Sequence, residues 1–340
     1  MSDKIFLQLP TFVNRTYRGG ALLREFLRVD DKEDNFCPED WISSFVEAKN
    51  KNYIRNEGIT KVVSEGEVCL INEVVDESDF GVGRESSGVL IKLLDAAERL
   101  GIQVHPTKEY AKKNFGTDYG KTECWYILDT RDSEACIYIG FKEHVTKEYF
   151  RSLFEKQDIP AMLDSMHRFE VSAGDVVLVT ASTPHAIGAG CFLLEVQEPT
   201  DYTMRVEKMT VAGEKLTPTQ IHYGLGEEKM LDCFSYDGAS ADEIKRRHFL
   251  PKHQISEGVF DLVSYKDTEC FALRTLEGGK YSACEPHFVT AVVLGDGGTL
   301  TFGNKTVSLK RGEKYFIAAN TQFEFDGAHI ALCFPPENKA

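Results

Sequence analysis

The chain has 340 residues, enough for two or three modest domains. Hydrophobic residues make up 42% and charged residues 27%, which is the usual balance of a globular protein. The formal net charge is -15, so we expect neither a nucleic acid nor an anionic membrane as partner, because both need a basic face. Small anionic substrates stay open, since a few local lysines can outweigh a distant negative field.

No apolar run approaches the roughly 20 residues of a membrane helix, and the first residues lack the apolar region of a signal peptide. Nine cysteines are scattered singly, without a C-x-x-C pair. Unpatterned cysteines in an acidic chain favour reduced thiols. We therefore expect a cytoplasmic protein.

Strand-like apolar runs dominate the first two hundred residues. The acidic run 33–40 is expected to be a solvated loop, and residues 89–100 fit a helix as well as a strand. The expected strands are 61–75, 135–141, 175–181 and 190–198. The expected helices are 108–115 and 146–157.

The second half begins with helical patterns and ends in strands. Helices are expected around 217–232, starting at Thr217-Pro218, and at 242–249, starting at Ser240. Residues 288–334 alternate in short runs separated by Gly- and Asp-rich turns, which predicts an antiparallel sandwich or barrel. We therefore expect a mainly β protein of two sandwiches with a few helices, divided into residues 1–235 and 236–340.

The stretch Ile-Gln-Val-His-Pro at residues 102–106 places Gln103 and His105 on one side of a short strand. Glu123 and His185 follow at later strand ends. One amide oxygen, one carboxylate and two imidazoles are suitable Zn²⁺ ligands, and a set without thiolates favours catalysis over a structural site. A histidine in a strand is also commonly just a hydrogen-bonded polar residue, so spacing by itself leaves both readings open.

Residues 86–128 closely resemble the metal-binding region of type I mannose-6-phosphate isomerases. That family has Gln-Val-His-Pro, a lysine shortly before a metal-binding glutamate, and Trp-Tyr, which here are Gln103 to Pro106, Lys121, Glu123 and Trp125-Tyr126. Residues 171–206 are similar to the family's Pro-His-Ala-x-Gly strand pair and later arginine, and the opening segment and Pro-Glu-Asp-Trp-Ile-Ser-Ser also match. At 340 residues the chain resembles the shorter bacterial form.

The resemblance implies two cupin-type jelly rolls, the first with one Zn²⁺ and the second without a metal site. It implies Gln103, His105, Glu123 and His185 as metal ligands. It further implies a cytoplasmic isomerase of carbohydrate metabolism that interconverts mannose 6-phosphate and fructose 6-phosphate through a cis-enediol. The expected catalytic residues are Arg205, Glu195 and Lys121, and the expected substrate-binding residues are Lys92, Lys121 and Arg205. Either a monomer or a homodimer fits.

Three departures from the family pattern concern phosphate recognition. The family usually has a serine where this chain has Gly101, a tryptophan where it has Arg18, and a tyrosine where it has Glu207. A glutamate beside a phosphate pocket is unfavourable if both charges are desolvated. These changes leave the expected metal ligands untouched.

Other functions remain open on these residues. The departures are compatible with an isomerase of a different aldose, phosphorylated or free. A sugar-binding cupin without catalysis would keep the metal and the fold. An iron-dependent cupin oxygenase fits less well, because glutamine is a poor ligand beside the usual two histidines and one carboxylate.

Overall fold

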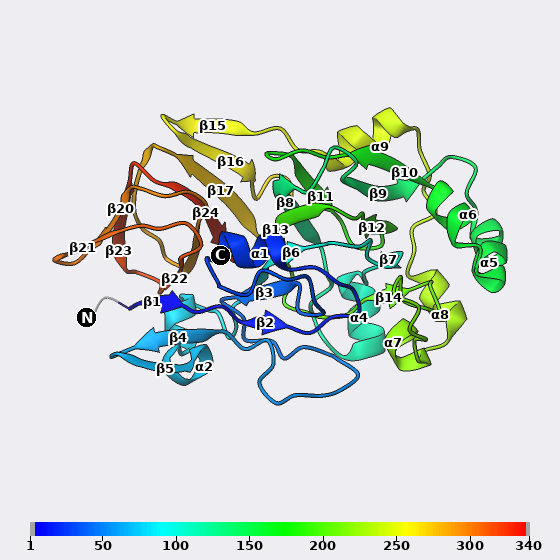
Figure 1. The fold of residues 1–340 in the computed structure, drawn as a ribbon, viewed down its shortest axis with the longest axis horizontal. Helices are drawn as coiled ribbons and strands as arrows, with labels where there is room; N and C mark the ends of the chain where they lie inside the picture. The colour runs from blue at the N-terminus through cyan, green and yellow to red at the C-terminus, as the bar shows by residue number, and fades with distance from the viewer. Residues whose placement is uncertain (1–3, 338–340) are drawn as a thin grey trace.

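The coordinates are a computed structural model that describes residues 4–337. Four antiparallel sheets lie in consecutive layers along the long axis of the molecule, with helices at one end (Figure 1). The six-stranded and five-stranded sheets form the N-terminal sandwich, and the nine-stranded and four-stranded sheets form the C-terminal sandwich. The expected mainly β class with two sandwiches is confirmed.

Apolar residues of both sheets fill the space between the sheets of the N-terminal sandwich, among them Trp125, Ile139 and Val177. The six-stranded sheet has the order β11 (Val176–Val179), β8 (Glu123–Thr130), β13 (Cys191–Gln197), β6 (Leu90–Asp95), β3 (Glu39–Ile42), β2 (Phe12–Val13). The five-stranded sheet has the order β10 (Met166–Glu170), β9 (Cys136–Phe141), β12 (His185–Ile187), β7 (Gln103–Val104), β14 (Met204–Arg205).

The C-terminal sandwich is filled by side chains such as Leu332, Phe323 and Phe325. The nine-stranded sheet has the order β15 (His253–Ser256), β16 (Val259–Val263), β17 (Ala272–Glu277), β24 (His329–Phe334), β19 (Val289–Val293), β22 (Lys314–Ile317), β1 (Ile5–Gln8), β4 (Lys61–Ser64), β5 (Glu67–Leu70). The four-stranded sheet has the order β18 (Lys280–Cys284), β23 (Gln322–Asp326), β20 (Thr299–Phe302), β21 (Lys305–Ser308).

The two sandwiches pack back to back. Residues of the six-stranded sheet such as Leu93 and Cys124 share one core with Leu273 and Phe316 of the nine-stranded sheet. The five-stranded sheet is covered on its outer face by α5 (Lys147–Lys156), α6 (Ile159–Asp164), α7 (Pro218–His222) and α8 (Glu227–Asp232). The remaining helices are α1 (Ala21–Phe26), α2 (Ile71–Val74), α3 (Glu77–Phe80), α4 (Lys108–Phe115) and α9 (Ala241–His248).

Most expected elements are confirmed. The ambiguous run 89–100 contains the strand β6, and Thr217 and Ser240 cap α7 and α9 as predicted. The prediction of a strand through 61–75 is wrong at its end, because residues 71–74 form α2 after the hairpin of β4 and β5. The solvated loop expected at 33–40 is also wrong at its end, since Glu39 and Asp40 are buried in β3.

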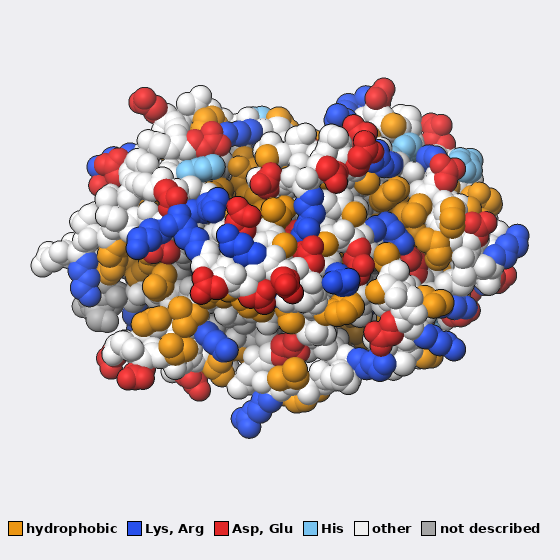
Figure 2. Space-filling model, viewed as in Figure 1, with side chains coloured by type: hydrophobic (Ala, Val, Ile, Leu, Met, Phe, Trp, Pro, Cys, Tyr) orange, Lys and Arg blue, Asp and Glu red, His pale blue; other side chains and the backbone are white. Residues whose placement is uncertain are grey.

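The division at residues 235 and 236 stays a prediction. The nine-stranded sheet takes most of its strands from the second half of the chain, but β1, β4 and β5 come from the first seventy residues. Acidic and basic side chains are interspersed over all layers on the face seen in Figure 2. Within residues 4–337, every helix is too short or too polar to cross a membrane.

Candidate metal centre and substrate cavity

A row of charged side chains crosses the inner face of the six-stranded sheet. Lys92 on β6 lies opposite Glu195 on β13, and the next strand β8 begins at Glu123, which lies opposite Gln197. Alternation along each strand sends the residues between them to the other face. Ile91, Leu93, Cys124, Leu194 and Val196 therefore pack in the core between the sandwiches. Cys124 therefore points away from Glu123.

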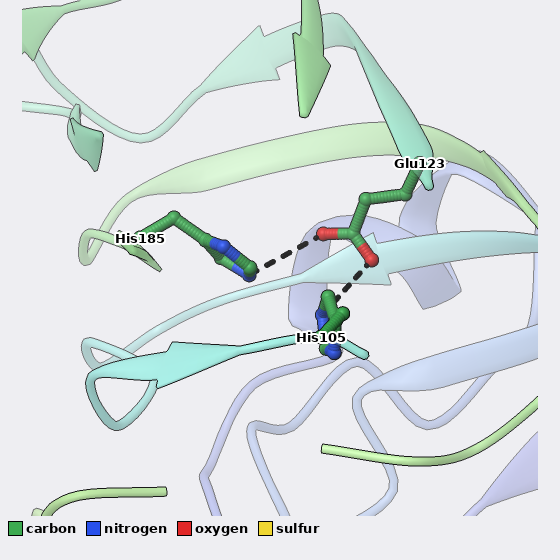
Figure 3. A group of neighbouring side chains, drawn as sticks. All are labelled: His105, Glu123 and His185. Atoms are coloured by element: carbon green, nitrogen blue, oxygen red, sulfur yellow. Dashed lines mark ion pairs between the residues drawn. The ribbon is translucent and has the colours of Figure 1, made fainter. Parts of the chain in front are cut away.

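Three side chains converge between the two sheets of the N-terminal sandwich (Figure 3). Glu123 enters from β8, His185 begins β12, and His105 follows β7 directly. Glu123 Oε2 lies 3.1 Å from His105 Nε2, and Glu123 Oε1 lies 3.5 Å from His185 Nε2. All three side chains are almost completely buried, and their ligand atoms lie within 4.8 Å of one another. The structure thus brings three segments that are distant in the sequence together at one centre.

Backbone carbonyls fix the orientation of both imidazoles. His105 Nδ1 lies 3.0 Å from the carbonyl oxygen of Tyr202, and His185 Nδ1 lies 2.8 Å from that of Thr183. A carbonyl only accepts hydrogen bonds, so we assign the proton of each ring to Nδ1. Each Nε2 therefore carries a lone pair that points towards Glu123. Such an outer hydrogen bond is the usual support of a metal-binding histidine.

The donor set fits a divalent cation. Two unprotonated imidazole nitrogens face a carboxylate whose Oε2 is buried and accepts no aligned hydrogen bond, although Lys121 Nζ lies 2.9 Å from that oxygen. Gln103 Nε2 lies 3.2 Å from His185 Nε2, and because amide oxygen and nitrogen are interchangeable by rotation, Oε1 can take this position. Lys121 supplies one positive charge to this buried group, and a divalent cation would compensate the remaining acceptors that face one another.

Lys121 and Glu195 lie beside the metal group. Lys121 Nζ is 2.8 Å from His105 Nε2 and 3.9 Å from Glu195 Oε1. Burial, together with the charge of Lys121, lowers the pKa of His105 to about 3, so the ring is neutral and able to bind a metal near neutral pH. Burial by itself would raise the pKa of Glu123, but the charge of Lys121 and the interactions with His105 and His185 together outweigh burial and hold that pKa well below its usual range.

Glu195 differs from Glu123 in its protonation. Burial raises the pKa of Glu195 to about 8, with a further contribution from the nearby charge of Glu123 and opposition from Lys92. Lys92 Nζ lies 3.5 Å from Glu195 Oε2 and 3.9 Å from Glu39 Oε2. A buried carboxyl whose pKa lies near neutrality can both accept and release a proton, whereas Glu123 stays ionised, as a metal ligand must.

Sequence reasoning missed a second charged network beside this group. Glu39 accepts hydrogen bonds from Arg15 Nε at 3.0 Å, Tyr17 Oη at 2.7 Å and Trp41 Nε1 at 2.7 Å. Arg15 also contacts both carboxylate oxygens of Asp201, at 2.7 and 3.2 Å. The one available signal was the alternation of Glu39 and Trp41 in the segment Pro-Glu-Asp-Trp-Ile. Nothing in the sequence indicated that Arg15 pairs with Asp201.

These residues line a cavity of about 380 Å³, within the range of small-molecule sites. Gln103, Lys121 and Glu123 lie in its wall together with Lys92 and Glu195. Arg205 on β14 also lines it and donates to the carbonyl oxygens of Thr203 and Gln220, at 3.3 and 2.8 Å. By residue type alone, Arg205 would be a surface ion-pair residue. Among the described residues, no carboxylate pairs with it.

The structure resolves part of the concern about Glu207. Its carboxylate accepts hydrogen bonds from Arg99 at 2.6 and 2.9 Å and from the backbone N–H of Ile102 at 2.7 Å. The charge of Glu207 is therefore compensated. Gly101 lines the cavity, and a Cβ added there would meet Glu207 Oε1 at 3.8 Å, an ordinary contact. A Cβ at position 101 therefore fits without a clash.

Residues 7–149 match the family described as phosphomannose isomerase type I, catalytic domain. The probable mannose-6-phosphate isomerase GmuF of Bacillus subtilis is 39% identical over 132 residues, which are 38% of this chain and 40% of that protein. The matched part of the chain therefore spans less than half of that relative. The mannose-6-phosphate isomerase of Streptococcus mutans is 27% identical over 334 residues, 96% of each chain. The resemblance seen in the sequence is confirmed.

Solved structures share the fold over nearly the whole chain. The mannose 6-phosphate isomerase from Bacillus subtilis superposes with a TM-score of 0.74 at 22% identity, covering 97% of this chain and 98% of that one. A zinc-bound mannose 6-phosphate isomerase gives a TM-score of 0.74 at 16% identity, covering 98% and 100%.

Proposed function

We propose that this chain, whose residues 7–149 match the type I phosphomannose isomerase catalytic domain, is a zinc-dependent isomerase of mannose 6-phosphate and fructose 6-phosphate. The observation that carries the proposal is the convergence of His105, Glu123 and His185 in one buried group, with both Nε2 lone pairs turned inwards. That group opens into a cavity of the size of a sugar phosphate and lined by cations.

His105, Glu123, His185 and Gln103 would hold one Zn²⁺. When bound, the metal supplies a Lewis acid that polarises the sugar oxygens at C1 and C2. The backbone carbonyls of Tyr202 and Thr183 keep the two imidazoles in the orientation that this role requires. Proton transfer and substrate binding would be carried out by the side chains around this metal group.

The reaction moves one proton between C2 and C1 and one between the two oxygens, through a cis-enediol. Glu195 would carry the proton between C1 and C2, because its pKa of about 8 lets it both accept and release a proton near neutrality. Lys121 lies between His105 and Glu195 and would stabilise negative charge on the sugar oxygens. Lys92 would orient Glu195 and bind a sugar hydroxyl.

Arg205 would act as a permanent charge. Its guanidinium does not titrate near neutrality and is held at the cavity wall by two carbonyl oxygens. It would bind the substrate and stabilise the developing enediolate. The nine thiols are all free, which supports the expectation of a cytoplasmic enzyme.

The direct test is turnover of a panel of aldoses and their 6-phosphates by purified protein. We expect mannose 6-phosphate to be converted to fructose 6-phosphate, activity to vanish with a chelator, and added Zn²⁺ to restore it. Turnover of free sugars alone would favour the isomerase of another aldose. Sugar binding without turnover at any metal would favour the binding cupin, and oxygen consumption with iron would favour the oxygenase.

A further inference from the structure

Six basic side chains line the substrate cavity, and four of them are already compensated by carboxylates. The four pairs are Arg15 with Glu39 and Asp201, Lys92 with Glu195, Lys121 with Glu123, and Lys51 with Glu214. Within residues 4–337, Lys49 and Arg205 line the cavity without a carboxylate partner. A phosphate group carries close to two negative charges near neutral pH, so these two cations match its charge.

Lys49 is held at the cavity by its backbone and by an aromatic ring. Its backbone N–H donates to Asp201 Oδ2 at 3.0 Å, the same carboxylate that pairs with Arg15. Its ammonium lies 3.6 Å from the centroid of the Tyr202 ring, which in turn stacks on Phe115 at 4.0 Å. A cation over an aromatic face keeps its N–H donors free for an anion on the other side.

Tyr202 connects this cation to the metal group. Its ring faces the Lys49 ammonium, while its carbonyl oxygen accepts the hydrogen bond from His105 Nδ1. Three residues later, Arg205 is fixed by the carbonyl of Thr203. The segment 201–205 thus carries Arg205 and contacts both Lys49 and the metal ligand His105.

We propose that Lys49 determines specificity for a phosphorylated sugar by binding the phosphate together with Arg205. The inference rests on the proposed isomerase function. It assigns the residues that would bind the phosphate end of the substrate, distant from C1 and C2. Lys51, two residues away, contributes less because Glu214 compensates its charge at 3.1 Å. Lys49 is a binding residue and takes no part in proton transfer.

The test is the kinetics of Lys49→Met with mannose 6-phosphate. We expect KM to rise about 10–100-fold, the range of a lost hydrogen bond between charged groups, with kcat within about threefold of wild type. Competitive inhibition by inorganic phosphate should weaken by a similar factor. Lys49→Arg should keep KM within about fivefold, because the charge remains. Arg55→Met removes an exposed charge from the same loop outside the cavity and should change neither value.

Two results would overturn the assignment. One is an unchanged KM in Lys49→Met, and the other is a fall in kcat with unchanged KM and unchanged phosphate inhibition. If the wild-type protein does not convert mannose 6-phosphate, the isomerase proposal fails by itself. Calorimetric titration with inorganic phosphate then decides the role of Lys49: weaker binding in Lys49→Met than in wild type supports it, and equal or absent binding rejects it.

Discussion

Between the sheets of the C-terminal sandwich lie apolar side chains such as Phe323, Phe325 and Leu332. Between the sheets of the N-terminal sandwich, the charged residues Lys92, Glu123 and Glu195 occupy buried positions at which the C-terminal sandwich has apolar side chains. The backbone layout is similar in both. A sandwich of this layout can therefore be filled by apolar side chains alone, and the charged side chains of the N-terminal sandwich carry a cost in desolvation.

The largest expected effect comes from removing a single carboxylate of that row. Glu195→Gln keeps the shape of the side chain but cannot carry a proton, so kcat should fall about 10²–10⁴-fold. The bound zinc should be unchanged, because Glu195 is not among the proposed ligands. The matched control is Glu324→Gln on β23 of the C-terminal sandwich, which should leave kcat as it is. Equal kcat in the wild type and Glu195→Gln would remove the proton role from Glu195.

A core deletion in the C-terminal sandwich should show the opposite pattern. Phe325→Ala empties a fully buried site and should lower the free energy of unfolding by about 3–5 kcal/mol, measured by urea denaturation. The kcat of the folded fraction should remain within about twofold of wild type. A fall in kcat much larger than the loss of folded protein would show that the C-terminal sandwich contributes to the chemistry.

The contact between the sandwiches contains one buried ion pair, between Lys314 on β22 and Asp40 on β3, with side chains 1% and 0% exposed. Lys314→Met leaves the Asp40 carboxylate unpaired and should cost about 3 kcal/mol of unfolding free energy. Adding Asp40→Leu should recover part of that loss, because no uncompensated charge remains. Denaturation curves of both variants check this, and a double variant less stable than Lys314→Met would contradict it.

The smallest effect is expected from a substitution at Cys124, which is adjacent in sequence to the proposed metal ligand Glu123. Cys124 points from β8 into the core between the sandwiches, so Cys124→Ala should cost about 1 kcal/mol of stability. Its zinc content and kcat should equal those of wild type. A variant that folds but loses zinc would show that the two faces of β8 are not independent.

The structural features that depend on local sequence patterns could be predicted from the sequence. Helix α4 covers the expected residues 108–115, and alternation along β8 separates Glu123 from Cys124 correctly. Parts that depend on distant pairing could not be predicted. Arg15 meets Asp201 across 186 positions, and β1 joins the sheet formed mainly by the last hundred residues. Asp40 can be buried because Lys314, which lies 274 positions away in the sequence, compensates its charge.

The central claim is that the N-terminal sandwich holds one zinc ion through Gln103, His105, Glu123 and His185. Its most direct test is the metal content of protein that has been saturated with Zn²⁺ and then desalted, for the wild type, Glu123→Gln and the control Glu324→Gln. We predict about one zinc per chain in the wild type and the control, and close to none in Glu123→Gln. Equal zinc in all three proteins, or none in the wild type, would contradict the claim.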